Sequence, residues 1–109
     1  MTLLRPLRMK TLKQNEPMQA KIWNHRQWVN ETDPDTLRAF YDKTLREAGF
    51  KVLACSDHHF APQGYTALWL LSESHFAVHT FPECGRSYIE LSSCNLDFFN
   101  HFLNLTRDL

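Results

Sequence analysis

The chain has 109 residues, of which 43% are apolar and 13% aromatic, and this content is enough for one compact hydrophobic core. Twelve basic residues balance twelve acidic residues, so the chain lacks the positive field that draws proteins to phosphate backbones or anionic membranes. Composition therefore argues against a nucleic-acid partner and favours a single small domain.

Residues 1–18 show no clean hydrophobic period and contain two prolines, so we expect a flexible N-terminal extension there and a single domain over residues 19–109. No segment approaches the roughly 20 apolar residues that a membrane helix needs. The three cysteines, Cys55, Cys84 and Cys94, are widely spaced and lack a secretory context. We expect free thiols in a soluble, cytoplasmic protein that does not bind membranes.

The first regular elements are a strand over residues 20–29 and an amphipathic helix that begins at Asp33 and Pro34. Asp caps the free amides of a first helical turn, and Pro at the first position has no N–H to leave unsatisfied. Apolar residues then recur at three- and four-residue steps as far as Ala48, and Gly49 follows as a C-terminal cap.

The second half of the chain predicts four more strands and a final helix. Alternating and β-branched residues predict strands at 50–60, 65–71, 75–81 and 87–91. An apolar stripe predicts a helix over residues 96–105. The expected fold is α+β, an antiparallel sheet with two helices packed on one face.

The segment with the most unusual composition is Leu-Ser-Glu-Ser-His-Phe-Ala-Val-His-Thr-Phe-Pro-Glu, residues 71–83. On a strand, His75, His79 and Phe81 share one face, while Phe76, Val78 and Thr80 share the other. One face is thus apolar and the other gathers imidazoles and an aromatic ring. These residues either lie on the solvated face of an ordinary strand or form a functional site.

Two other kinds of site are possible in residue types. His75, His79, Cys84 and Cys94 are four candidate zinc ligands, but four residues along a strand span about 13 Å, too far for two imidazoles to bind one ion. A serine hydrolase could use Ser72 or Ser74 with His79, but no Gly-x-Ser-x-Gly elbow surrounds either serine. We therefore expect no metal and no hydrolase triad.

Residues 71–83 resemble the self-processing segment of the bacterial and archaeal S-adenosylmethionine decarboxylases. That family carries a cysteine twenty residues after the processed serine, and here Cys94 follows Ser74 by that interval. Its Phe-x-Pro-x-Gly-x-Ser stretch corresponds to residues 60–66, Phe-Ala-Pro-Gln-Gly-Tyr-Thr. The resemblance covers residues 60–94, about a third of the chain.

The resemblance implies a precursor that cuts itself between Glu73 and Ser74. The Ser74 hydroxyl attacks the Glu73 carbonyl, the amide becomes an ester, and β-elimination with hydrolysis leaves a pyruvoyl group at position 74. By similarity His79 acts as base and proton shuttle, and Thr66 supplies a hydroxyl to the tetrahedral intermediate. The family usually has serine at the Thr66 position, and threonine keeps the donor while adding a methyl group.

In the mature enzyme that the resemblance implies, the self-derived pyruvoyl group is the cofactor and forms a Schiff base with the substrate. Cys94 returns a proton to the substrate's α-carbon. Phe60 and Phe81 match adenine-stacking rings, and Glu83 matches the carboxylate that binds ribose hydroxyls. These residues imply decarboxylation of S-adenosylmethionine to the aminopropyl donor for spermidine synthesis.

The match fails on the first strand, where the family has Gly-x-His and an acidic residue and this chain reads Lys-Ile-Trp-Asn-His-Arg-Gln-Trp over residues 21–28. A changed first strand is where the substrate could switch to arginine or ornithine, and a homologue that binds ligand without catalysis is a third reading. By resemblance the protomers pair sheet to sheet, as a homodimer or a higher oligomer, with sites shared between protomers.

Overall fold

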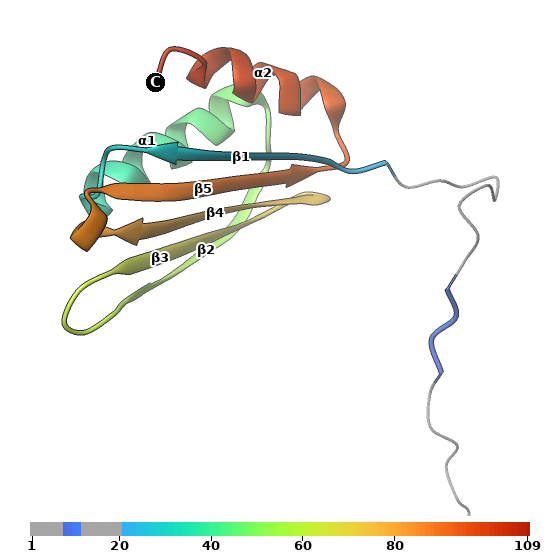
Figure 1. The fold of residues 1–109 in the computed structure, drawn as a ribbon. Helices are drawn as coiled ribbons and strands as arrows, with labels where there is room; N and C mark the ends of the chain where they lie inside the picture. The colour runs from blue at the N-terminus through green and yellow to red at the C-terminus, as the bar shows by residue number, and fades with distance from the viewer. Residues whose placement is uncertain (1–7, 12–20) are drawn as a thin grey trace, which may run out of the picture.

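The computed structural model describes residues 8–11 and 21–109. Over these residues the chain forms five antiparallel strands, two α-helices and one 3-10 helix (Figure 1). In chain order the elements are β1 (Trp23–Val29), α1 (Pro34–Ala48), β2 (Val52–His59), β3 (Tyr65–Leu71), β4 (Ser74–Phe81), η1 (Pro82–Cys84), β5 (Arg86–Ser93) and α2 (Leu96–Thr106). The expected α+β class is confirmed, whereas most of the expected extension at 1–18 lies outside the described residues.

The strands lie in the order β1-β5-β4-β3-β2, so the first strand forms one edge and pairs with the last. Within residues 21–109, only β1–β5 joins strands distant in sequence, while β2 to β5 form a meander of neighbouring hairpins. The strand predicted at 87–91 extends to Arg86–Ser93. Its polar ends gave no strand signal, but pairing with β1 and β4 continues through Ser93.

The ends of α1 form as the sequence predicts. The Asp33 side chain accepts a hydrogen bond from the Thr36 N–H at 2.9 Å, which caps the first turn. Gly49 ends the helix with a φ of 111°, a conformation that favours glycine. A Cβ at Gly49 would also lie 2.7 Å from the Phe98 ring, so glycine allows α2 to approach the end of α1.

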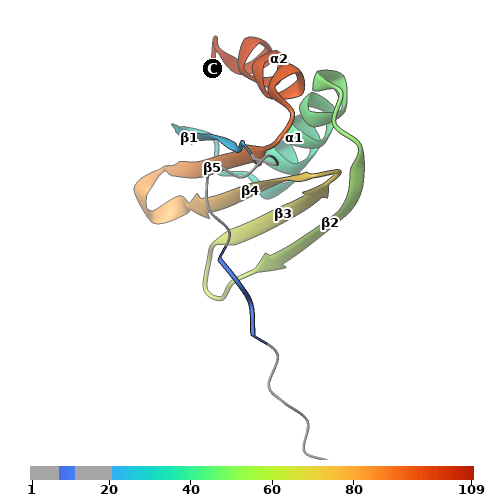
Figure 2. The same cartoon turned by 90° about the vertical axis from the view of Figure 1, so that its right-hand side faces the viewer.

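The helices α1 and α2 cover one face of the sheet and leave the other face bare (Figure 2). Helix residues such as Tyr41 and Phe102 pack with strand residues such as Trp69 and Phe76 in one buried cluster. Along β4 the buried residues are Ser74, Phe76, Val78 and Thr80, whereas His75, Ala77, His79 and Phe81 lie on the opposite, open face. The alternation predicted for residues 75–81 is therefore confirmed. None of the helices in the described residues is long and apolar enough to cross a membrane.

Candidate functional site

The predicted site residues fall into two groups at opposite ends of the sheet. We call the end where β4 begins and β5 finishes the Ser74 end, and the end where β4 finishes and β5 begins the Phe81 end (Figure 1). The group at the Ser74 end contains Glu73, Ser74 and Cys94. The group at the Phe81 end contains Phe60, Thr66, His79, Phe81 and Glu83.

At the Ser74 end, β3 and β4 are joined by a two-residue turn, Ser72 and Glu73, between the paired residues Leu71 and Ser74. Glu73 has a φ of 57°, and it is the one non-glycine residue with positive φ among the described residues. A non-glycine residue in this left-handed region costs on the order of 1–3 kcal/mol, which the rest of the structure has to offset. The expected scissile bond therefore directly follows a strained residue.

Ser74 is the first residue of β4 and faces the helices, with 8% of its surface exposed. Its Oγ donates a hydrogen bond to the Oγ of Ser93, at 2.8 Å. Ser93 is its cross-strand partner on β5 and is fully buried. Position 74 thus lies in a dry environment next to a neutral hydroxyl group.

Cys94 follows Ser93 directly and is solvent-exposed. Because Ser93 is in register with Ser74, Cys94 lies one residue beyond the expected cleavage site on the neighbouring strand. Pairing of β4 with β5 therefore brings together two residues that are twenty positions apart in sequence. All three cysteines are free thiols, as expected.

On the open face, Thr66 and His79 are cross-strand partners, and Thr66 Oγ1 lies 2.9 Å from His79 Nδ1. This contact holds the imidazole through Nδ1 and leaves Nε2 for other partners. The imidazole also stacks on Tyr88 of β5, with ring centroids 6.5 Å apart and an interplanar angle of 25°. His79 is thus held from both neighbouring strands.

Tyr65, next to Thr66, secures this part of β3 to its surroundings. Its hydroxyl donates to the Asp57 carboxylate at 2.7 Å, and Arg38 of α1 binds the same carboxylate. Burial raises the pKa of Tyr65 to about 12. The hydrogen bond from Tyr65 and the charge of Arg38 lower the pKa of Asp57, so the carboxylate stays ionised near neutral pH.

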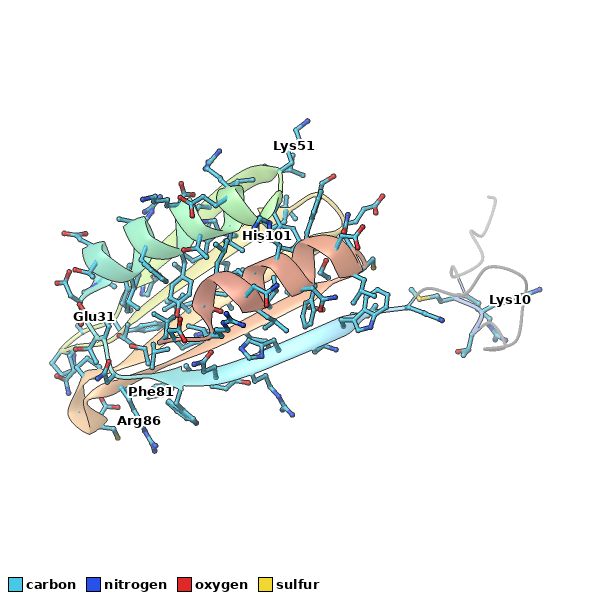
Figure 3. All side chains as sticks on the ribbon, turned by 90° about the horizontal axis from the view of Figure 1, so that it is seen from above. Lys10, Glu31, Lys51, Phe81, Arg86 and His101 are labelled. Carbon is cyan, nitrogen blue, oxygen red and sulfur yellow. The ribbon has the colours of Figure 1, made fainter. Side chains whose placement is uncertain are left out.

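The residues expected to bind a nucleoside lie at the Phe81 end. Phe60 is 51% exposed in the loop after β2, and Gly64, with a φ of 110°, closes this loop through a hydrogen bond to the Phe60 N–H. Phe81 is 38% exposed, and Glu83 is exposed in η1. Figure 3 shows Phe81 next to its cross-strand partner Arg86 at this end.

Within one chain these two groups do not meet. His79 follows Ser74 by five positions, which is about 17 Å along a strand. An odd separation also puts the two side chains on opposite faces of the sheet, as their burial shows. His79 therefore cannot reach the Glu73–Ser74 bond of its own chain in this fold.

Ser93 is a polar contact of Ser74 that the sequence reasoning missed. A signal was present, since the two-residue period from Phe76 and Val78 places Ser74 on the helix-facing side. The identity of its partner depends on the register between β4 and β5. In residues 8–11 and 21–109, no three His, Cys, Asp or Glu side chains are grouped closely enough to bind a metal ion.

Comparisons with known proteins agree on one family. The family model described as "S-adenosylmethionine decarboxylase" matches residues 28–104. Proteins named S-adenosylmethionine decarboxylase proenzyme are 44% identical over 48 residues in Pelotomaculum thermopropionicum and 37% identical over 66 residues in Prochlorococcus marinus. These alignments cover 44% and 61% of this chain, and 38% and 54% of the relatives, so the chain spans about half the length of the relatives it matches.

A solved structure, the adenosylmethionine decarboxylase from Aquifex aeolicus, has the same fold. Its TM-score is 0.58 with 18% sequence identity, over 76% of this chain and 77% of that chain. At this identity the likeness concerns the fold alone.

Proposed function

The chain belongs to the S-adenosylmethionine decarboxylase family, and from this premise we propose that it is a proenzyme that cuts itself between Glu73 and Ser74 to become a pyruvoyl-dependent S-adenosylmethionine decarboxylase. The observation that carries the proposal is the left-handed Glu73 directly before a buried, hydrogen-bonded Ser74. Strain at the residue that supplies the scissile carbonyl favours the bond's rearrangement.

The cleavage begins as an acyl shift. Ser74 Oγ forms a bond to the Glu73 carbonyl carbon, the bond from that carbon to the Ser74 nitrogen breaks, and the hydroxyl proton ends on this nitrogen. The resulting ester then undergoes β-elimination, and hydrolysis leaves a pyruvoyl group at position 74 and releases ammonia. The two products are residues 1–73 and residues 74–109.

The surroundings of Ser74 suit a carbonyl cofactor formed in place. Position 74 is buried, and its neighbour on β5 is the uncharged hydroxyl of Ser93. When formed, a pyruvoyl group supplies an electron sink for decarboxylation of an α-amino acid. Cys94 lies beside this position and would return a proton to the substrate's α-carbon.

The substrate class follows from the Phe81 end, where Phe60, Phe81 and Glu83 are accessible to solvent. Two aromatic rings can stack on an adenine, and a carboxylate can accept hydrogen bonds from ribose hydroxyls. Free arginine or ornithine would leave these three side chains without a partner. We therefore favour the nucleoside substrate.

A second copy of the chain would complete the site. His79 lies on the open face, about 17 Å along the strand from Ser74, so the base expected for cleavage has to come from elsewhere. The open face also exposes Leu68 and Leu70 beside a depression of about 400 Å³. An apolar sheet face of this kind suits packing against the same face of a second copy.

The first test is the intact mass of the purified protein and of its Ser74→Ala variant. We expect two fragments that divide between Glu73 and Ser74 in the wild type, with the second blocked to Edman degradation, and one uncut chain in Ser74→Ala. Ser72→Ala removes an exposed hydroxyl from the same turn and should leave cleavage intact. An uncut wild-type chain would contradict the proposal.

The substrate is tested separately on the cleaved protein. We expect release of labelled carbon dioxide from carboxyl-labelled S-adenosylmethionine and none from arginine or ornithine. Release from arginine or ornithine alone would retain the pyruvoyl mechanism and overturn the substrate. No release from any of the three would point to a homologue that is processed without being a decarboxylase.

A further inference from the structure

Ser93 is a buried hydroxyl to which neither the family resemblance nor the proposed reaction assigns a role. It is fully buried, lies on the inner strand β5 and is in register with Ser74. Its neighbour Ser92 lies on the open face, so the chain places two serines side by side in sequence with only one of them at the cleavage site.

All the hydrogen-bonding capacity of Ser93 is used. Its Oγ accepts the Asn95 N–H at 2.9 Å and lies 3.3 Å from the Asn95 carbonyl oxygen, to which it donates its own proton. A hydroxyl has one proton and two lone pairs, so one acceptor position remains, and the Ser74 hydroxyl fills it at 2.8 Å. The direction of the Ser74 hydrogen bond follows from this accounting.

The direction of the hydrogen bond between Ser74 and Ser93 matters because the Ser74 oxygen needs a free lone pair to act as a nucleophile. When Ser74 donates its proton to Ser93, both lone pairs of its own oxygen stay unoccupied. The same hydrogen bond restricts rotation of the Ser74 side chain, which removes part of the entropic cost of attack. Asn95 also caps α2, accepting from the Phe98 N–H at 3.0 Å, so Ser93 is fixed by a helix end rather than by a free loop.

We infer that Ser93 is a positioning residue for self-cleavage, which holds the Ser74 hydroxyl ready to attack the Glu73 carbonyl. The inference rests on the proposed function, since it concerns the acyl shift described there. Ser93 gains and loses no covalent bond in this step, and the Ser74 proton is carried onward by the base. The residue acts only through Ser74.

If the hydrogen bond between Ser74 and Ser93 serves only to stabilise the fold, a different outcome is expected. Ser93→Ala would then lower stability, because the Asn95 N–H and the Ser74 O–H would lose a partner, but the rate of cleavage would not change. Cleavage rate and thermal stability therefore have to be measured for the same substitutions.

The experiment follows cleavage of the full chain by intact mass after a pulse of cell-free synthesis, for wild type, Ser93→Ala, Ser93→Thr and Ser92→Ala. We expect cleavage of Ser93→Ala to be at least about tenfold slower. Ser93→Thr keeps the hydroxyl and should retain most of the rate, and Ser92→Ala is the matched control on the opposite face. Tm values of the Ser93 and Ser92 variants in a Ser74→Ala background, which cannot be cut, report how far loss of the Asn95 contacts of Ser93 lowers stability.

Hydroxylamine identifies the step that is slowed, because it cleaves the ester and leaves a free Ser74 amino terminus. We expect Ser93→Ala to yield less of this fragment than the wild type at equal times. A wild-type cleavage rate in Ser93→Ala would overturn the inference, as would equal slowing in Ser93→Thr or ester yields equal to wild type. An uncut wild-type chain would instead refute the proposed function.

Discussion

At the scale of single residues, the strongest feature of the molecule is the strain placed beside the expected scissile bond. Glu73 has a left-handed backbone in a two-residue turn, a position at which proteins commonly use glycine or asparagine. A protein with glutamate at this position is therefore less stable than one with glycine, which adopts positive φ without steric cost. The unfavourable backbone conformation thus lies at the residue that supplies the carbonyl of the expected scissile bond.

This strain predicts the effect of Glu73→Gly. In the Ser74→Ala background, which cannot be cut, Glu73→Gly should stabilise the fold by about 1 kcal/mol, because glycine adopts positive φ without steric cost. For a domain of this size the expected rise in Tm is about 4–8 °C. Thermal unfolding followed by circular dichroism measures it, and Ser72→Gly is the matched control in the same turn. A lower Tm for Glu73→Gly would show that the Glu73 side chain makes a stabilising contact.

At the scale of elements, α1 is the segment that holds the sheet to its helical layer. Leu37, Tyr41 and Leu45 are buried against the sheet, and the hydroxyl of Tyr41 has its pKa raised to about 12 by burial. Arg38 and Asp42 extend the contact, since they bind Asp57 of β2 and the Trp69 indole of β3. Loss of helix stability should therefore loosen the strands that carry Thr66.

The first turn of α1 provides a pH-dependent test of this coupling. The Asp33 carboxylate accepts from the Thr36 amide and hydroxyl, and these hydrogen bonds lower the pKa of Asp33. The pKa of Asp33 is therefore lower in the folded chain than in the unfolded chain. Its charge stabilises the fold at pH values above the unfolded pKa, and this stabilisation is lost as the pH falls through the folded pKa. Asp33→Ala should therefore lower Tm by a few degrees at pH 7, and by less near pH 3.

The control for this experiment is Asp35→Ala, which removes a carboxylate from the same turn without removing the cap. We expect Asp35→Ala to change Tm less than Asp33→Ala at pH 7. A Tm difference between wild type and Asp33→Ala that stays constant from pH 7 to pH 3 would mean that the carboxylate charge does not contribute to the cap.

At the scale of the whole molecule, the proposed cleavage requires a base to reach Ser74. The sheet separates the two groups along its length and by its thickness. Bringing Ser74 and His79 of one chain together would require breaking the β4 ladder on both sides. Association of two copies through their open faces requires no such disruption. If the strands of the two sheets run in opposite directions, it would place the Phe81 end of one chain near the Ser74 end of the other. The partner's His79 would then approach the Glu73–Ser74 peptide from the open face, while the Ser74 side chain points to the helices.

Complementation between two inactive chains tests this arrangement. Ser74→Ala and His79→Ala should each remain uncut alone, but their co-expression should restore cleavage of the His79→Ala chain, which keeps Ser74 and borrows His79 from its partner. Intact mass distinguishes the two chains. Cleavage that is absent from the mixture, although mixed dimers form, would show that His79 acts within its own chain or has no part in cleavage.

The sequence by itself determined the order of helices and strands, the α+β class and the two faces of β4. Asp33, Pro34 and Gly49 set the ends of α1 through local hydrogen bonds and backbone conformation, which depend on neighbouring residues alone. The alternation of His75, Phe76, Ala77 and Val78 determined the faces of β4, because the period of a strand is fixed by its geometry.

Tertiary structure decided which residues meet. The pairing of β1 with β5 joins segments more than fifty residues apart, and no local pattern specifies it. The register of β4 on β5 places Ser93 beside Ser74, and a shift of one residue would have placed Ser92 or Cys94 there instead. Ser74 and His79 lie close together in the sequence of the segment 71–83. The extended backbone nevertheless separates them in space, since a strand advances about 3.4 Å with each residue.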